Sequence, residues 1–128
     1  MIPFFGLDRE YKKYREEYID IFDKTMLTGK VLQGDAVGQL ESCLAAKVGR
    51  KFAVAVNSAT DALYFALVSC GIKPGDEVLV SNFSFIASAS CIIRLGAVPV
   101  FCDIDTDDYH MLAKDVAAQT TTKTKAIV

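Results

Sequence analysis

From Phe52 onward the chain alternates short, continuously apolar segments with segments of helical periodicity. The apolar segments have the length of strands and show no polar–apolar alternation. Strands of this kind are typical of a parallel sheet whose two faces are covered by helices. The sequence therefore predicts an α/β fold with three layers (helix, sheet, helix) and a mostly parallel sheet. Strands are expected at 52–56, 77–81, 98–103 and from 125, and helices at 60–70, 86–95 and 112–119.

The first 50 residues have a different pattern and are expected to be helical. A helix is predicted from Asp8 to Leu27, because apolar and aromatic side chains recur there at three- and four-residue spacings. A glycine-containing loop follows at 28–35, and a second helix is predicted with Asp35 as N-cap and Gly49 as its end. The stripe of the first helix is a packing surface or an interface. It consists of Tyr11, Tyr14, Tyr18, Ile21 and Phe22.

The turn at 57–61 (NSATD) ends the first predicted strand and begins a helix. Such a turn leaves backbone N–H groups without partners at the positive end of the helix dipole. Ser58 or Thr60 is the expected N-cap. The sequence has neither a Walker A loop nor a dinucleotide fingerprint. The turn is therefore a candidate phosphate site, and an ordinary strand-to-helix connection is the alternative.

Two phenylalanines lie in a polar loop after the second predicted strand, in the segment 81–85 (SNFSF). Ligands of open α/β sheets bind outside the carboxyl ends of the strands. Phe85 is therefore a candidate for stacking on a flat ring, and the alternative is that Phe83 and Phe85 both cover the core.

The acidic residues, the histidine, the lysines and the cysteines give no pattern that indicates a catalytic residue or a metal site. The carboxylates between 103 and 108 lack the glycine and glutamate of a calcium loop, so we expect a solvated turn. His110 stands alone, and no lysine has the apolar context of a Schiff-base lysine. Buried free thiols, rather than disulfides or metal ligands, are expected for the widely spaced cysteines. These are Cys43, Cys70, Cys91 and Cys102.

Composition argues against several classes of partner and location. A net charge of −2 provides no electrostatic footprint for nucleic acid or an anionic membrane. No apolar run is long enough to span a membrane, and the first residues do not have the pattern of a signal peptide. We therefore expect a cytoplasmic protein without nucleic-acid or membrane partners. The apolar run at 126–128 ends the chain inside an expected strand, which suggests that a further segment is missing.

Together these segments resemble the sugar aminotransferase family called DegT/DnrJ/EryC1/StrS. The resemblance extends from Ile2 to the last residue and includes the Gly29–Gly34 loop. It is specific because many segments match in order and spacing. They include NSATDALYFAL at 57–67, GIKPGDEVLVSNFSFIASA at 71–89, GAVPVFCDID at 96–105 and TKTKAIV at 122–128.

The resemblance implies a role for the candidate site residues. The fold would be part of the large domain of fold-type I pyridoxal-phosphate enzymes, with a helical segment at 1–50 and βα units at 51–128. The turn Ser58, Ala59 and Thr60 would bind the phosphate of pyridoxal phosphate through backbone amides and a hydroxyl. Phe85 would stack on the pyridine ring. Ala59 stands where the family usually has glycine. The loop at 29–34 would lie near the active site, often close to a neighbouring subunit.

The resemblance also implies an activity and a limit to it. Such an enzyme transfers an amino group, with glutamate as the expected donor, to a keto-sugar nucleotide in polysaccharide or secondary-metabolite biosynthesis. A homodimer, or pairing with another chain, is expected. The family's Schiff-base lysine and the acidic partner of the pyridine nitrogen lie beyond residue 128, so this chain is expected to be an N-terminal portion that is inactive alone.

Two alternatives remain at this point. The first is a non-catalytic remnant or half-protein that works only by pairing with another chain, and the second is an α/β nucleotide-binding domain that uses the same phosphate site. The family's fold also places the first strand beside the last strand of the large domain, away from the second and third. We therefore expect exposed apolar helix faces and open sheet edges.

Overall fold

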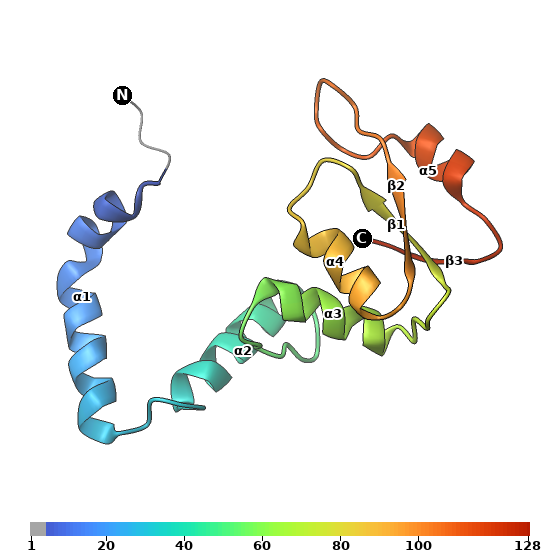
Figure 1. The fold of residues 1–128 in the computed structure, drawn as a ribbon. Helices are drawn as coiled ribbons and strands as arrows, with labels where there is room; N and C mark the ends of the chain where they lie inside the picture. Colours follow the sequence, from blue (N-terminus) through green and yellow to red (C-terminus); the bar gives the residue numbers. More distant parts are fainter. Residues whose placement is uncertain (1–4) are drawn as a thin grey trace. The chain divides into compact units, whose positions relative to one another are not determined.

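The computed structural model describes residues 5–128, which divide into two compact units, one up to Val54 and the other from Ala55 onward (Figure 1). The first unit contains two helices, α1 (Leu7–Thr28) and α2 (Asp35–Lys47). The second contains three strands and three helices in the order α3, β1, α4, β2, α5, β3. None of the helices in the described residues combines the length and apolar character needed to cross a membrane.

Both helices of the first unit agree closely with the sequence prediction, with two differences. Non-helical backbone angles at Tyr14 kink α1. The N-cap of α2 is Gly34, without a side-chain cap bond, so the prediction of Asp35 as N-cap is wrong. Asp35 lies in the first turn instead, where its carboxylate still interacts favourably with the helix dipole. The helix ends at Val48 and Gly49, whose positive φ of 65° is the usual left-handed stop.

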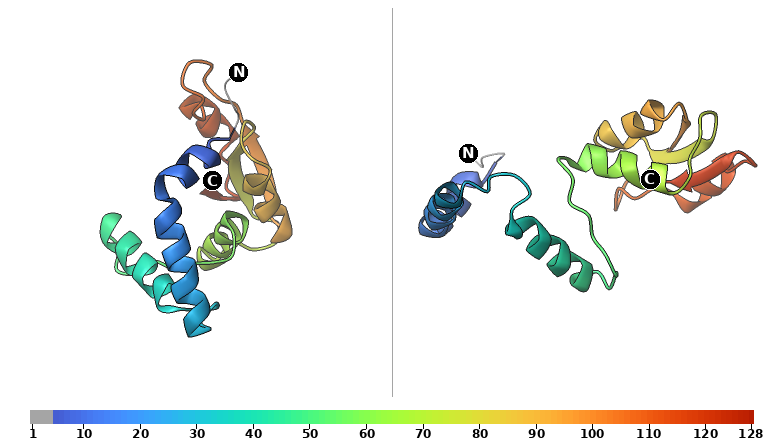
Figure 2. Two further views of the ribbon diagram at one scale, coloured as in Figure 1. Left: turned by 90° about the vertical axis from the view of Figure 1, so that its left-hand side faces the viewer. Right: turned by 90° about the horizontal axis from the view of Figure 1, so that it is seen from below.

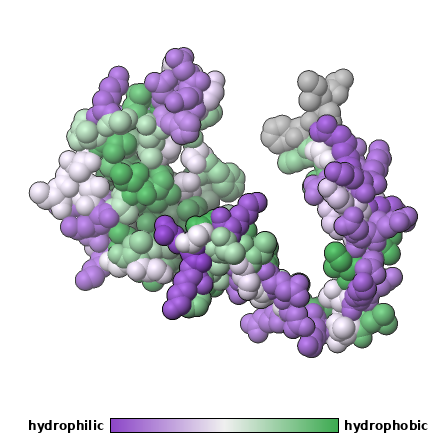
Figure 3. Space-filling view, turned by 180° about the vertical axis from the view of Figure 1, so that it is seen from behind, coloured by the Kyte–Doolittle hydropathy of each residue, from purple (hydrophilic) through white to green (hydrophobic). Residues whose placement is uncertain are grey.

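The apolar faces of α1 and α2 are exposed in the described part of the chain. No residue of α1 is buried, and only Ala45 of α2 is. The predicted aromatic stripe of α1 is thus not covered, and its assignment as an interface stays a prediction. Figure 3 shows hydrophobic residues, in green, exposed on both units. The exposed apolar side chains of α2 are Val37, Leu40 and Leu44.

The second unit is built on a parallel sheet of three strands, β1 (Glu77–Ser81), β2 (Val98–Cys102) and β3 (Thr124–Ile127). β1 lies in the middle, so the order is β2-β1-β3. Leu79 of β1 is paired with Val100 on one side and with Ile127 on the other. The prediction of parallel strands from continuous apolar runs is confirmed for these three segments.

Helices cover both faces of this sheet. α3 (Ala59–Ser69) packs on α4 (Ala87–Arg94), which contacts β1 and β2. α5 (Ala113–Gln119) also contacts β2, from the opposite face of the sheet (Figures 1 and 2). The expected three-layer α/β arrangement is therefore present in partial form.

The core of the unit lies between the sheet and the pair α3 and α4. It includes Val78 and Val80 of β1 and Cys91 and Ile92 of α4. Cys102 of β2 is also fully buried but is not part of this cluster. Cys43 and Cys70 are exposed, so the prediction that all four thiols are buried is wrong for these two. Cys70 is the C-cap of α3, and Cys43 lies on the uncovered helix α2. The largest fully buried side chains are Leu79, Ile92, Val78 and Val80.

The segment 52–56 is not a strand, which contradicts the sequence prediction. A strand requires a hydrogen-bonded neighbour, and both sides of β1 are already occupied by β2 and β3. No described strand pairs with this segment, and Phe52 and Val54 are 74% and 79% exposed. The position of the first apolar segment relative to the other strands of the family's fold stays a prediction.

Candidate functional site

Ser58 caps the helix that follows the first apolar segment. Its backbone is extended, with φ −156° and ψ 155°, and α3 begins at the next residue. The Ser58 Oγ accepts a hydrogen bond from the Asp61 backbone N–H at 3.1 Å. The Ser58 carbonyl accepts the first helical bond, from Ala62 N at 3.0 Å. Ser58 is therefore the N-cap of α3, which confirms one of the two residues predicted for this role.

The backbone N–H groups of the first two residues of α3 are available to a ligand. Within residues 5–128 the N–H groups of Ala59 and Thr60 make no hydrogen bond, and neither does the Thr60 hydroxyl. Ala59 carries only a methyl group and is exposed. Two free N–H groups and a hydroxyl at the positive end of a helix dipole are donors suited to a phosphate. The residues present thus fit the phosphate group that the sequence predicted for this turn.

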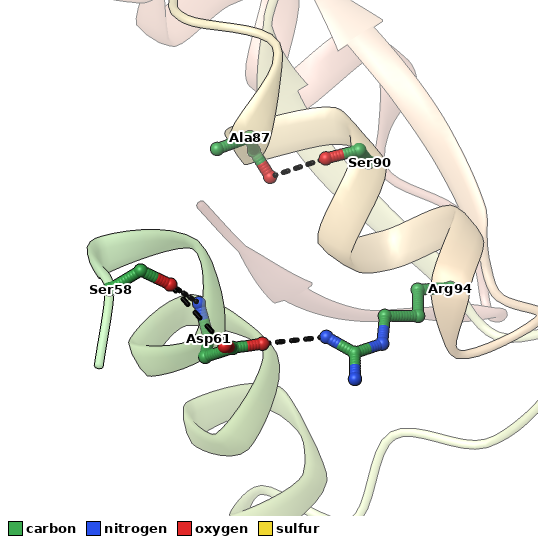
Figure 4. Close-up of polar contacts among 5 residues, drawn as sticks. All are labelled: Ser58, Asp61, Ala87, Ser90 and Arg94. Carbon is green, nitrogen blue, oxygen red and sulfur yellow. Dashed lines mark hydrogen bonds and ion pairs between the residues drawn. The ribbon is translucent and has the colours of Figure 1, made fainter. Parts of the chain in front are cut away.

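A charged contact joins this turn to α4. Arg94 Nη1 lies 2.7 Å from Asp61 Oδ1, and the guanidinium carbon lies 4.1 Å from the centre of the Tyr64 ring. Figure 4 shows the Asp61 carboxylate between Ser58 and Arg94. Hydrogen bonds, first from Arg94 and then from Asn57, hold the pKa of Asp61 below its usual value. Asp61 is therefore ionised at neutral pH, and its charge is balanced by Arg94.

Phe85 lies in the loop that connects β1 to α4, and its ring is 76% exposed. Its carbonyl accepts the Ser88 N–H at 3.0 Å, which holds the backbone at the start of α4. In the described chain the Phe85 ring makes no aromatic or cation contact, whereas Phe83 packs against Tyr109 at 5.9 Å between ring centres. Both rings are exposed, so the alternative that they cover the core is wrong. In residues 5–128 no hydrogen bond or ring contact joins Phe85 to the turn at 58–60.

The acidic segment after β2 is a hydrogen-bonded turn. Asp105 accepts the Asp107 N–H at 2.8 Å, and Asp108 accepts the His110 N–H at 2.9 Å. These bonds within the loop occupy carboxylate oxygens, as in Asx turns. The prediction of a solvated turn is confirmed, and the residues described contain no group of three or more potential metal ligands.

Sequence reasoning missed the contact between Asp61 and Arg94. Asp61 and Tyr64 are three residues apart on one helix, which places them on one face. Arg94 is 33 residues further along the chain than Asp61. Only the packing of α3 on α4 brings it there, and no local pattern indicates which of the many charged residues would be the partner.

Comparison with known proteins decides the family. The sequence profile of the DegT/DnrJ/EryC1/StrS aminotransferase family matches residues 12–128, nearly the whole chain. The chain belongs to this family. Enzymes of the DegT/DnrJ/EryC1/StrS family depend on pyridoxal phosphate and belong to fold-type I of the pyridoxal-phosphate enzymes. The resemblance predicted from the sequence is thereby confirmed.

Curated relatives are similar over almost all of the chain. The spore coat polysaccharide biosynthesis protein SpsC of Bacillus subtilis is 44% identical over 113 residues, which cover 88% of this chain and 29% of that protein. The UDP-2-acetamido-2-deoxy-3-oxo-D-glucuronate aminotransferase of Pseudomonas aeruginosa is 33% identical over 128 residues, which cover 100% of this chain and 36% of that enzyme. The chain spans about a third of the length of these relatives.

A solved structure supports the fold assignment. DesV of S. venezuelae superposes with a TM-score of 0.92 at 33% sequence identity, and the match covers 98% of this chain and 34% of DesV. The chain therefore has the fold of a partial domain of the family's enzymes.

Proposed function

We propose that this chain is the N-terminal part of the cofactor-binding large domain of a pyridoxal-phosphate-dependent nucleotide-sugar aminotransferase, and that it supplies the seat for the cofactor's phosphate. One observation carries the proposal. The start of α3 presents the free N–H groups of Ala59 and Thr60 beside the hydroxyls of Ser58 and Thr60. In a chain of this family, a phosphate is the ligand that such a set of donors fits best.

Each site residue has a distinct part in this proposal. Ala59 and Thr60 hold the phosphate by backbone N–H groups and the Thr60 hydroxyl, and Ser58, whose hydroxyl donates to Asp61 Oδ2 at 3.3 Å, contributes its backbone N–H and the cap of the helix. Phe85, whose exposed ring has no partner in the described chain, stacks on the pyridine ring. When bound, the cofactor supplies the electron sink that amino transfer requires.

The substrate of the whole enzyme is proposed to be a keto-sugar nucleotide, with glutamate as amino donor and a product used in polysaccharide or secondary-metabolite biosynthesis. The names of the Bacillus and Pseudomonas relatives support this class, since one acts in spore coat polysaccharide biosynthesis and the other on a UDP-linked oxo-sugar. A cytoplasmic location and a homodimer follow from the same proposal.

We further propose that the chain alone does not catalyse the reaction. Every lysine in the described part of the chain is exposed, whereas a lysine that forms a Schiff base needs a desolvated or electrostatically tuned site. The nucleophile would then come from the remainder of the enzyme. The chain would contribute phosphate binding and ring stacking only.

A second candidate is a half-protein that works by pairing with another chain. The exposed apolar residues of α2 favour it, because an uncovered apolar helix face is rarely stable alone in water. They include Val37, Leu40 and Leu44. Size-exclusion chromatography and a co-expression pull-down with the downstream enzyme segment as a separate chain test this candidate: stable binding with recovery of activity supports the half-protein, and no binding contradicts it.

The test of phosphate binding uses pyridoxamine 5′-phosphate, because the aldehyde of pyridoxal phosphate reacts with exposed lysines unspecifically. Calorimetric titration of the full chain compares this ligand with pyridoxamine, which lacks the phosphate, and with ATP. We expect binding of pyridoxamine 5′-phosphate and markedly weaker binding of pyridoxamine. Equal affinity for the two amines would contradict the phosphate seat, and tight binding of ATP alone would support a nucleotide-binding domain.

A further inference from the structure

We propose that Arg94 is a positioning residue for the phosphate site: by pairing with Asp61 it prevents that carboxylate from repelling a bound phosphate. The inference rests on the proposed function of the turn at 58–60. It assigns a role to two residues that the phosphate site does not itself include.

A carboxylate so close to a phosphate site is an electrostatic problem. Asp61 is the third residue of α3, and its Oδ2 lies 3.3 Å from the Ser58 Oγ. The negative charge of the Asp61 carboxylate lies next to the proposed phosphate site, so it competes with the phosphate for the positive end of the α3 dipole. Left unbalanced, that charge would repel a phosphate dianion across a few ångströms.

Arg94 is placed to balance this charge. It lies in the last turn of α4 and reaches α3 at two points, the Asp61 carboxylate and the Tyr64 ring. The distance of 2.7 Å to Asp61 Oδ1 is that of a charge-assisted hydrogen bond. The cation–π contact at 4.1 Å restrains the guanidinium over the Tyr64 ring, so less side-chain freedom is lost when Arg94 pairs with Asp61.

The partial burial of the pair makes its effect larger than that of an ordinary surface pair. The Asp61 side chain is 22% exposed and that of Arg94 is 56% exposed. In Figure 4 one carboxylate oxygen faces Arg94 and the other faces Ser58. Within residues 5–128 no other charged side chain contacts Asp61, and the lowered pKa keeps it ionised at neutral pH. The positive charge of Arg94 therefore balances the negative charge of Asp61.

The experiment is a double-mutant cycle in the full chain, with pyridoxamine 5′-phosphate as the probe. Arg94→Gln removes the balancing charge, and we expect its affinity to fall by about tenfold at low salt and by less at high salt. Asp61→Asn removes the repelling charge, keeps the backbone N–H that bonds to Ser58, and should bind at least as tightly as the wild type. The double variant should recover most of the affinity that Arg94→Gln loses. Arg50→Gln is the charge-matched control.

The outcomes separate this inference from the proposed function. If Arg94 only stabilises the packing of α3 on α4, the double variant will bind no better than Arg94→Gln, and that result would overturn the inference. Wild-type affinity in Arg94→Gln would also overturn it while leaving the phosphate seat intact.

Failure of the wild type to bind pyridoxamine 5′-phosphate would instead reject the proposed cofactor. The same four variants are then titrated with inorganic phosphate. Loss in Arg94→Gln with recovery in the double variant supports charge compensation, and equal binding, or none, by all four rejects it. The pKa of Asp61, measured by NMR of its side-chain carboxyl carbon, must rise in Arg94→Gln; an unchanged value would rule out the pairing.

Discussion

The side-chain amide of Asn82 donates a hydrogen bond of 3.1 Å to the carboxylate of Asp103 and thereby joins the loops that follow β1 and β2. A backbone bond of 3.0 Å from Asn82 N to Cys102 O lies beside it. The Asp103 Oδ1 also accepts the Ile104 N–H at 2.9 Å. These bonds lie at the carboxyl end of parallel strands, where ligands of such sheets bind.

The link between Asn82 and Asp103 predicts a pH-dependent stability. Bonds from the Ile104 N–H and then from Asn82 lower the pKa of Asp103 from its usual 3.8. A lowered pKa means that this stabilisation is present above the unfolded pKa of 3.8 and is lost as the pH falls through the lower folded value. Asn82→Ala should therefore lower the free energy of unfolding at pH 7 and have little effect well below pH 3.8. Urea unfolding at both pH values measures this.

The matched control for that variant is Gln119→Ala, which removes an exposed amide that makes no side-chain hydrogen bond in the described chain. It should leave stability unchanged at both pH values. A loss of stability in Asn82→Ala that does not diminish as the pH falls from 7 to well below 3.8 would contradict the role of Asp103 ionisation.

Ser58→Ala should destabilise α3. The substitution removes the oxygen that accepts the Asp61 N–H at 3.1 Å, and loss of an N-cap costs about 0.5–2 kcal/mol. Ser58→Asn keeps an uncharged acceptor and should retain most of the stability, whereas Ser58→Asp sets a second carboxylate beside Asp61 Oδ2, which lies 3.3 Å from the Ser58 Oγ, and should retain less. The negative charge of Ser58→Asp at the proposed phosphate site should also weaken binding of pyridoxamine 5′-phosphate. Thermal unfolding and calorimetry together separate these effects. Equal stability of Ser58→Ala and wild type would argue against the cap.

Thr60→Val tests the phosphate contact without a change of shape. The Thr60 hydroxyl has no partner in the described chain, so its loss should not affect stability. A hydrogen bond to a charged group contributes roughly 1.5–3 kcal/mol, and the affinity for pyridoxamine 5′-phosphate should fall by about ten- to a hundredfold. Thr106→Val, at an exposed position in the loop after β2, is the control. Unchanged affinity would exclude Thr60 as a ligand.

Two glycines with the same backbone conformation separate strain from crowding. Gly96 and Gly71 have φ values of 73° and 76°, which side-chain-bearing residues adopt at a cost of roughly 1–2 kcal/mol. A Cβ at Gly96 would lie 3.2 Å from the Pro74 Cβ, whereas one at Gly71 meets nothing within 4 Å. Gly96→Ala should therefore destabilise the chain more than Gly71→Ala. Denaturant unfolding of both variants checks the order, and a reversed order would refute the packing argument.

Much of the second unit follows from local sequence. The β1 prediction at 77–81 agrees with the structure in both bounds, and the boundaries of α4 and β2 differ by one residue at the ends where they differ. Continuous apolar runs and the polar turns between them carry enough information because strand and helix formation there depends on near neighbours. The segment 52–56 has the same apolar pattern but is no strand, because a strand also needs a partner to hydrogen-bond with.

In the candidate site, too, some features are predictable from the local sequence and one depends on tertiary packing. Residue type and position predict an N-cap at Ser58 or Thr60, free backbone N–H groups at this turn and an aromatic ring at Phe85, and the family resemblance adds Ala59 as a phosphate contact. These features depend on a turn and its immediate neighbours, and the structure places each of them at the start or entry of a helix. Asp61 was recognised only as part of the turn, and its bond to Arg94 was not predicted.

The sequence by itself thus determined the family, the parallel α/β pattern and the donors at the start of α3, since all three depend on order, spacing and local hydrogen bonding. Only the tertiary structure decided that β1 lies between β2 and β3, and that Arg94 of α4 reaches Asp61 of α3. The physical reason is that both relationships join residues far apart in the chain, and packing alone selects one partner among many with the same chemistry.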